Sequence, residues 1–149
     1  MKGGRQGKDD TAQESPEDLQ LKWKQLGDLA LAVGEVELSM DCATKAGDLS
    51  GLLLMYTAYG DRERTTELMN TARSQGKFNV AFAAAYTLGE VDACVDMLVE
   101  AGRVPEAALF ARTYVPSRVA EVVACWKGDL SKISPVASQA LADPGQHPE

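Results

Sequence analysis

Three carboxylates are the residues whose type and spacing come nearest to a chemical site. Asp92, Asp96 and Glu100 recur every fourth residue, which places them on one face of a helix. Oxygen ligands of this kind suit a hard cation such as Ca²⁺ or Mg²⁺. A cation site needs ligands that converge from more than one element, and the sequence offers no second group. We therefore predict a solvated acidic helix face here and no metal site.

The hydroxyl side chains lack the partners that would make them nucleophiles. Ser117 and the neighbours Thr65 and Thr66 have no histidine or carboxylate placed beside them by a recognisable motif. The only histidine, His147, lies in the C-terminal segment without a plausible catalytic neighbour. The glycines are spaced a helix apart, unlike the grouped glycines of a phosphate-binding loop. The sequence therefore predicts no enzyme activity and no cofactor.

The cysteines are also more typical of a structural role. No CxxC pair or Cys/His pair is present to hold zinc. We expect small, reduced core residues at all three positions. They are Cys42, Cys94 and Cys125.

Composition excludes several classes of protein. The chain has 149 residues, of which 45% are hydrophobic, and a net charge of −7. The negative charge argues against nucleic-acid binding, which needs a basic surface. The longest apolar run, residues 80–85, is far too short to cross a bilayer, and the N-terminus lacks the apolar core of a signal peptide. These features favour a cytosolic protein.

Glycines recur at intervals of one short helix plus a turn. They occupy positions 34, 47, 60, 76, 89 and 102, with gaps of 13, 13, 16, 13 and 13 residues. The segment 34–47 also echoes the segment 89–102 at an offset of 55 residues. Glycine suits the position after a helix C-terminus. A fixed period in this range indicates stacked helical hairpins.

The segments between these stops predict an all-α fold, an α-solenoid of stacked antiparallel hairpins (TPR-like) with about nine helices. Ser15 and Pro16 begin the first helix, and Asp48 and Asp61 are suited to cap the third and fourth. The apolar residues of the first helix are predicted to share one face: Leu19, Trp23, Leu26, Ala30 and Val33. Later helices are predicted at 49–59, 62–75, 78–88, 91–100, 105–113 and 116–127. No stretch alternates like a strand.

The last helix is predicted to begin after Asp129 and to end before Asp143. Its apolar residues are predicted to share one face: Ile133, Val136, Ala137, Ala140 and Leu141. We expect one domain at 15–142, between a disordered N-terminal tail at 1–14 and a C-terminal tail at 143–149.

The third and fifth predicted helices are apolar on nearly every side, whereas the second, fourth and sixth have a polar face. In a zigzag of hairpins, odd and even helices form opposite layers, so the odd layer would be the one that is covered. Its apolar residues fill the core of the stack or anchor a partner. The candidate partner-interface residues are Leu52, Leu53, Tyr56, Tyr59, Phe78, Phe82 and Tyr86.

Several long segments resemble the beta-prime subunits of coatomer, the COPI vesicle coat. They are residues 21–26, 48–54, 76–82 and 104–117. The likeness runs from about residue 19 to 144, and the segments 129–132 and 141–144 favour beta-prime over the alpha subunit, which shares much of the pattern. Members of this family carry N-terminal β-propellers that read dilysine signals, and nothing in this sequence corresponds to a propeller.

This resemblance implies a C-terminal piece of the family's α-solenoid and a structural role in the outer coat. The implied partners are the alpha-coatomer subunit and other coatomer subunits, in Golgi–ER vesicle transport. The implied location is the cytoplasm and, peripherally through the coat, Golgi membranes and COPI vesicles. No nucleic acid or small-molecule substrate is expected. The alternative is a stand-alone TPR-like adaptor that binds short peptides in a groove, although such grooves are usually polar or basic.

Overall fold

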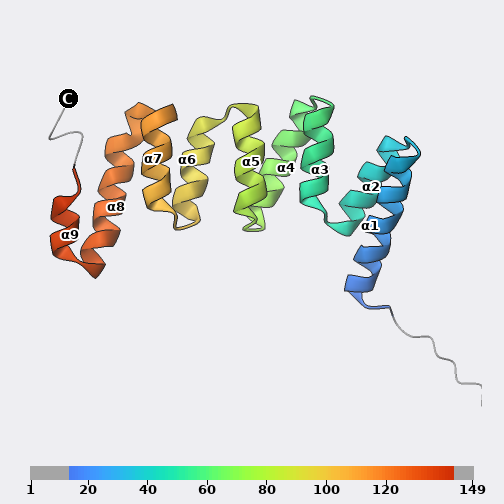
Figure 1. Cartoon of the computed structure of the whole chain (residues 1–149), viewed down its shortest axis with the longest axis horizontal. Helices are drawn as coiled ribbons and strands as arrows, with labels where there is room; N and C mark the ends of the chain where they lie inside the picture. The colour runs from blue at the N-terminus through green and yellow to red at the C-terminus, as the bar shows by residue number, and fades with distance from the viewer. Residues whose placement is uncertain (1–13, 143–149) are drawn as a thin grey trace, which may run out of the picture. The chain divides into compact units, whose positions relative to one another are not determined.

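The computed structural model describes residues 14–142. Within that range the chain forms nine α-helices, one 3-10 helix and no strand (Figure 1), which confirms the all-α prediction. The helices belong to two compact units, residues 1–48 and 49–149. Residues 1–13 and 143–149, which hold nearly all of the two predicted tails and His147, lie outside the described residues.

Unit 1 contains α1 (Pro16–Ala32) and α2 (Val36–Ala46). Ser15 caps α1 as predicted, because its hydroxyl accepts a hydrogen bond from the Asp18 backbone N–H at 3.1 Å. Of the predicted apolar face, Ala30 is buried and Trp23 half-buried, with the Lys45 ammonium 4.3 Å from the centre of its ring. The other three members of that face are exposed within the unit: Leu19, Leu26 and Val33.

Gly27 brings α1 and α2 close together. A Cβ atom at this position would lie 3.1 Å from the Cys42 Cβ and 3.5 Å from the Ser39 carbonyl oxygen. Cys42 and Ser39 are both buried. The glycine therefore has a packing role, which outweighs its low helix propensity.

We expect Gly27→Leu to lower the free energy of unfolding of unit 1 by about 1–3 kcal/mol, because the added side chain must push the helices apart. Urea unfolding followed by Trp23 fluorescence, in a chain whose Trp126 is changed to phenylalanine, measures this. Gly128→Ala is the control, since nothing lies within 4 Å of a Cβ at Gly128 in its helix. Because Gly128 lies in unit 2, that change should leave the Trp23 transition of unit 1 unchanged. Equal stability of Gly27→Leu and wild type would show that the contact is not tight.

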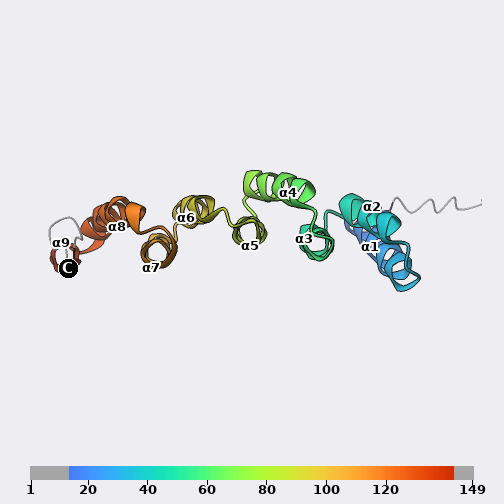
Figure 2. The same ribbon diagram turned by 90° about the horizontal axis from the view of Figure 1, so that it is seen from above.

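Unit 2 contains the remaining helices in two layers. Figure 2 shows α3, α5 and α7 on one side, the odd layer, and α4, α6 and α8 on the other, the even layer. This is the predicted zigzag of antiparallel hairpins. The helix bounds are α3 Leu49–Ala58, α4 Arg62–Ser74, α5 Phe78–Leu88, α6 Val91–Glu100, α7 Val104–Tyr114, η1 Pro116–Arg118, α8 Val119–Ile133 and α9 Pro135–Ala140.

The glycines predicted to follow helix ends do so. All six glycines of the repeat have a positive φ, between 67° and 84°, which is the left-handed conformation that ends a helix at low cost. Asp61 caps α4, because its carboxylate accepts from the Arg64 backbone N–H at 2.9 Å. The regular stops explain why short helices of 10 to 13 residues follow one another from α3 to α7.

Small residues let the layers of unit 2 pack closely. Alanines from α5 and α7 are completely buried: Ala81, Ala84, Ala85, Ala107 and Ala111. Ala107 and Ala111 belong to one core cluster with Val95 of α6 and Val122 of α8. Met97, Val95 and Val122 are the largest fully buried side chains. On α6 itself, Cys94, Val95 and Leu98 are all buried, whereas Val91 and Val99 are half-buried.

The C-terminal helices differ from the prediction. The predictions that one helix ends at Lys127 and that another begins after Asp129 are wrong, because α8 continues through Gly128 to Ile133. The break falls at Ser134, whose extended backbone (φ −149°, ψ 104°) is the conformation favoured before Pro135. The predicted shared face of this last helix is also wrong, because the break divides it. Ile133 and Val136 are both largely exposed.

Candidate interaction surface

The acidic residues of α6 bind arginines from the neighbouring hairpins. Glu100 pairs with Arg73 of α4, with 3.0 Å between the arginine Nε and a carboxylate oxygen. Asp96 lies 2.7 Å from Arg118, whose guanidinium also donates to the Asp92 carbonyl at 3.2 Å. The three acidic side chains stay exposed, as predicted, at 69%, 42% and 43%, and the structure adds their arginine partners. Among residues 14–142 no cluster of His, Cys, Asp or Glu suits a metal ion.

Arg118 links η1 to α6 across the even layer. Its side chain is mostly buried and bonds Asp96 and Glu121 in addition to the Asp92 carbonyl. These bonds raise the pKa of Arg118 and hold the pKa of Glu121 below its ordinary value. The sequence analysis missed this arginine. The spacing in the sequence could have revealed it. In a stack of repeats, opposite charges about one hairpin apart meet, as Arg73 and Glu100 do.

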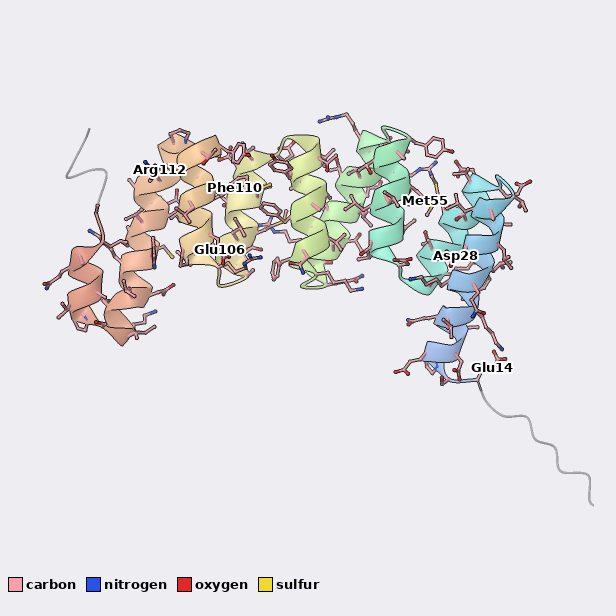
Figure 3. The ribbon with its side chains drawn as sticks, in the orientation of Figure 1. Glu14, Asp28, Met55, Glu106, Phe110 and Arg112 are labelled. Carbon is pink, nitrogen blue, oxygen red and sulfur yellow. The ribbon has the colours of Figure 1, made fainter. Side chains whose placement is uncertain are left out.

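We expect Arg118→Met to lower the free energy of unfolding by about 0.5–1.5 kcal/mol, because its lost partners are largely exposed and solvent screens such ion pairs. Wild-type stability should also fall more steeply on acidification below pH about 4.3, the ordinary glutamate pKa. A carboxyl whose folded pKa is lowered stabilises the fold above its unfolded pKa, and this is lost as the pH falls through the folded value. Urea melts of both proteins from neutral to acidic pH test this. Arg112→Met, exposed on α7 (Figure 3), is the control.

Within the odd layer, α5 and α7 are connected by aromatic rings. Phe82 meets Phe110 edge-on with 5.5 Å between ring centres, and Tyr86 meets Tyr114 in the same way at 5.8 Å. The two tyrosine hydroxyls lie 3.1 Å apart, a hydrogen bond that raises the pKa of Tyr86. Figure 3 shows Phe110 part-way along α7. These four residues, the aromatic cluster, connect α5 to α7.

Large apolar side chains stay exposed along the odd layer. Leu54 on α3 is 71% exposed and Leu109 on α7 is 62% exposed. We call these residues and their exposed neighbours the odd-layer row: Leu54, Tyr59 in the turn after α3, Tyr86, Leu109 and Tyr114. In the even layer, α4 and α6 contribute no exposed large apolar residue, and α8 contributes Ile133 at its last position. The two faces of unit 2 therefore differ in chemistry, and the odd layer is the apolar one.

The predicted interface residues fall into three groups in the structure. Leu52 is buried in the core. Leu53, Tyr56, Phe78 and Phe82 are half-buried. Tyr59 and Tyr86 are exposed and belong to the odd-layer row. Their contact with a partner stays a prediction.

Three exposed members of the row were not among the predicted residues. Leu54 and Leu109 lie on helices with apolar residues in several directions, so no period marks the outer side. Tyr114 could have been found by its spacing, because it follows Tyr86 by 28 residues, about one hairpin. Phe110 follows Phe82 at the same interval.

The hydroxyl and thiol side chains singled out in the sequence have structural surroundings. Thr66 donates to the Arg62 carbonyl one turn earlier, at 2.8 Å. Cys42 and Cys94 are buried, whereas Cys125 is exposed, which corrects the prediction for that residue. Burial raises the pKa of the Cys94 thiol to about 11, with a smaller contribution from the charge of Glu90.

No helix within residues 14–142 combines the length and the apolar character needed to traverse a membrane.

Comparison with known proteins gives one consistent result. A sequence profile described as "COPA/B TPR domain" matches residues 9–127. The chain is 50% identical over 143 residues to coatomer subunit beta'-3 of Arabidopsis thaliana, covering 95% of this chain and 16% of the relative. It is 48% identical over 127 residues to coatomer subunit beta'-1 of Oryza sativa subsp. japonica, and 44% identical over 126 residues to human coatomer subunit beta', covering 85% of this chain and 14% of each relative. The chain thus spans about one sixth or one seventh of the length of these curated relatives.

Proposed function

Because the chain belongs to the COPA/B TPR domain family, we propose that it is a structural helical-repeat segment of a beta-prime coatomer subunit. Its proposed role is to bind other helical-repeat subunits of the COPI coat, first among them the alpha-coatomer subunit. The relatives are named as coatomer beta' subunits, which supports this role. The proposal places the chain in vesicle transport between the Golgi and the endoplasmic reticulum.

One observation carries the proposal: the odd layer of unit 2 exposes a row of large apolar side chains that nothing in the chain's described residues covers. Leu54 and Leu109 are more than half exposed, on helices that carry hardly any charge. Several large exposed apolar side chains in one layer are typical of a protein–protein contact site. A second stack of helices with a matching apolar face would bury it.

The proposed role is structural and involves no catalytic step. The chain would reach membranes peripherally, by joining the coat from the cytoplasmic side of the Golgi and of COPI vesicles. The peptide-binding adaptor receives less support. Grooves that grip peptide termini use polar and basic residues, whereas α3 and α5 carry no charged residue.

Size-exclusion chromatography with light scattering tests the proposal. The full chain is run alone, and then with a purified helical-repeat fragment of the alpha-coatomer subunit. We expect a complex whose mass is the sum of the two chains. A chain that elutes apart from that fragment at every mixing ratio would overturn the proposal.

A further inference from the structure

A cavity of about 340 Å³ lies between α5 and α7, at the end where α7 begins. Helix α6 provides its floor through Met97, Leu98 and Ala101. Its walls are aromatic: Phe78 and Phe82 come from α5, and Phe110 comes from α7. The remaining lining residues are Asn79, Arg103 and Glu106. The cavity is therefore apolar inside, with the polar groups on the hairpin ends.

The walls of the cavity are held in place by the aromatic cluster. Phe82 and Phe110, which face the cavity, also contact each other edge-on. Tyr86 stacks against Phe82 and meets Tyr114, so that rings fill the groove between α5 and α7 beyond the cavity. Because the rings support one another, the cavity exists before any partner arrives.

The residues that line the cavity carry no net charge. Helix α5 has no charged residue, and α7 has only Glu106 and Arg112. Glu106 forms an ion pair with Arg103, so the two charges beside the cavity cancel. This neutrality stands out in a chain of net charge −7. An uncharged group is therefore the occupant that this site matches.

We propose that the cavity receives one large apolar side chain, such as leucine or phenylalanine, from an amphipathic helix of the partner. This inference rests on the proposed function and identifies the central anchor of that contact. A cavity of about 150 Å³ can hold benzene, so the volume here is sufficient. The exposed Tyr86, Leu109 and Tyr114 lie on the same two helices and would contact the flanking residues of the partner helix. Such an anchor in a pocket, ringed by weaker contacts, is the usual source of binding energy.

Ala101→Leu tests the anchor by filling the cavity from within the chain. Ala101 ends α6 with right-handed helical backbone angles (φ −75°, ψ 0°), so any L-residue fits its backbone. The thermal midpoint should equal or exceed that of wild type, because apolar space is filled. Binding of the alpha-coatomer helical-repeat fragment, measured by calorimetry on the full chain, should weaken at least about thirtyfold. Ala124→Leu, exposed on α8, is the matched control and should bind like wild type.

If Ala101→Leu melts at a lower temperature than wild type, Asn79→Glu replaces it. Asn79 is exposed, and a carboxylate there would have to lose water when an apolar side chain enters. This variant should also weaken binding.

Other results would overturn the inference. If wild type binds the fragment and both variants bind equally well, the cavity is not the anchor site, although the proposed function stands. If wild type does not bind the fragment at all, both proposals fail together. Wild-type dimers that become monomers in Ala101→Leu would make a second copy the occupant. A small apolar molecule retained in native mass spectrometry would make the cavity a ligand site.

Discussion

Replacing Leu54, Tyr59 and Leu109 together by serine should weaken binding to the alpha-coatomer fragment at least about a hundredfold and leave thermal unfolding nearly unchanged. All three side chains are mostly exposed, on α3, in the turn after it and on α7, so their removal creates no cavity in the fold. Each would be buried against a partner, where apolar burial contributes about 25 cal/mol per Å². Calorimetric titration measures the affinity, and circular dichroism measures the midpoint.

The matched control for this triple variant uses exposed apolar residues outside the odd-layer row. Ile133 and Val136 are 83% and 78% exposed. Changing both to serine removes two exposed apolar side chains and should leave the affinity within about a factor of two, because rim or non-contact residues contribute little. If the control weakened binding as strongly as the triple variant, the contact would lie at the C-terminal end of unit 2. If neither set had an effect, the odd layer would not be the docking face.

The sequence was sufficient to predict the helices because their ends are marked by local chemistry. Positive-φ glycines and caps such as Ser15 and Asp61 act within a few residues, so their meaning does not depend on the rest of the fold. The signal failed at Gly128 and Asp129, which resemble a helix stop but lie within α8. There the nearby Pro135 determined the break, since proline restricts the residue before it.

The outward-facing residues were harder to predict, for a physical reason. A helix such as α3 is apolar on several sides, and therefore has no period that separates core from surface. Leu52 is buried while Leu54, two residues on, is largely exposed. Which of the two leucines is buried depends on where α4 and α5 pack against α3. Contacts between hairpins, such as the pairing of Arg73 with Glu100, also depend on the stacking interval and not on local sequence.

Met97 has the largest fully buried side chain of the fold, at 1% exposure. We expect Met97→Ala to lower the free energy of unfolding by about 2–5 kcal/mol, the cost of a buried methionine truncated to alanine. Met97 already lines the cavity between α5 and α7, so the truncation enlarges an existing space that the surrounding alanines cannot fill. For a chain of marginal stability this is a large share of the total.

Thiol labelling locates the effect of Met97→Ala within the chain. Cys94 lies three residues earlier on α6 and is buried, with its pKa raised to about 11, so it should react only when unit 2 opens. Its labelling rate should rise at least about thirtyfold in the variant, since 1.4 kcal/mol corresponds to tenfold. Exposed Cys125 should react at once in both proteins, and buried Cys42 reports on unit 1 in the same experiment. An unchanged Cys94 rate would mean that Met97 does not support the core around α6, and that the cavity beside it collapses at little cost.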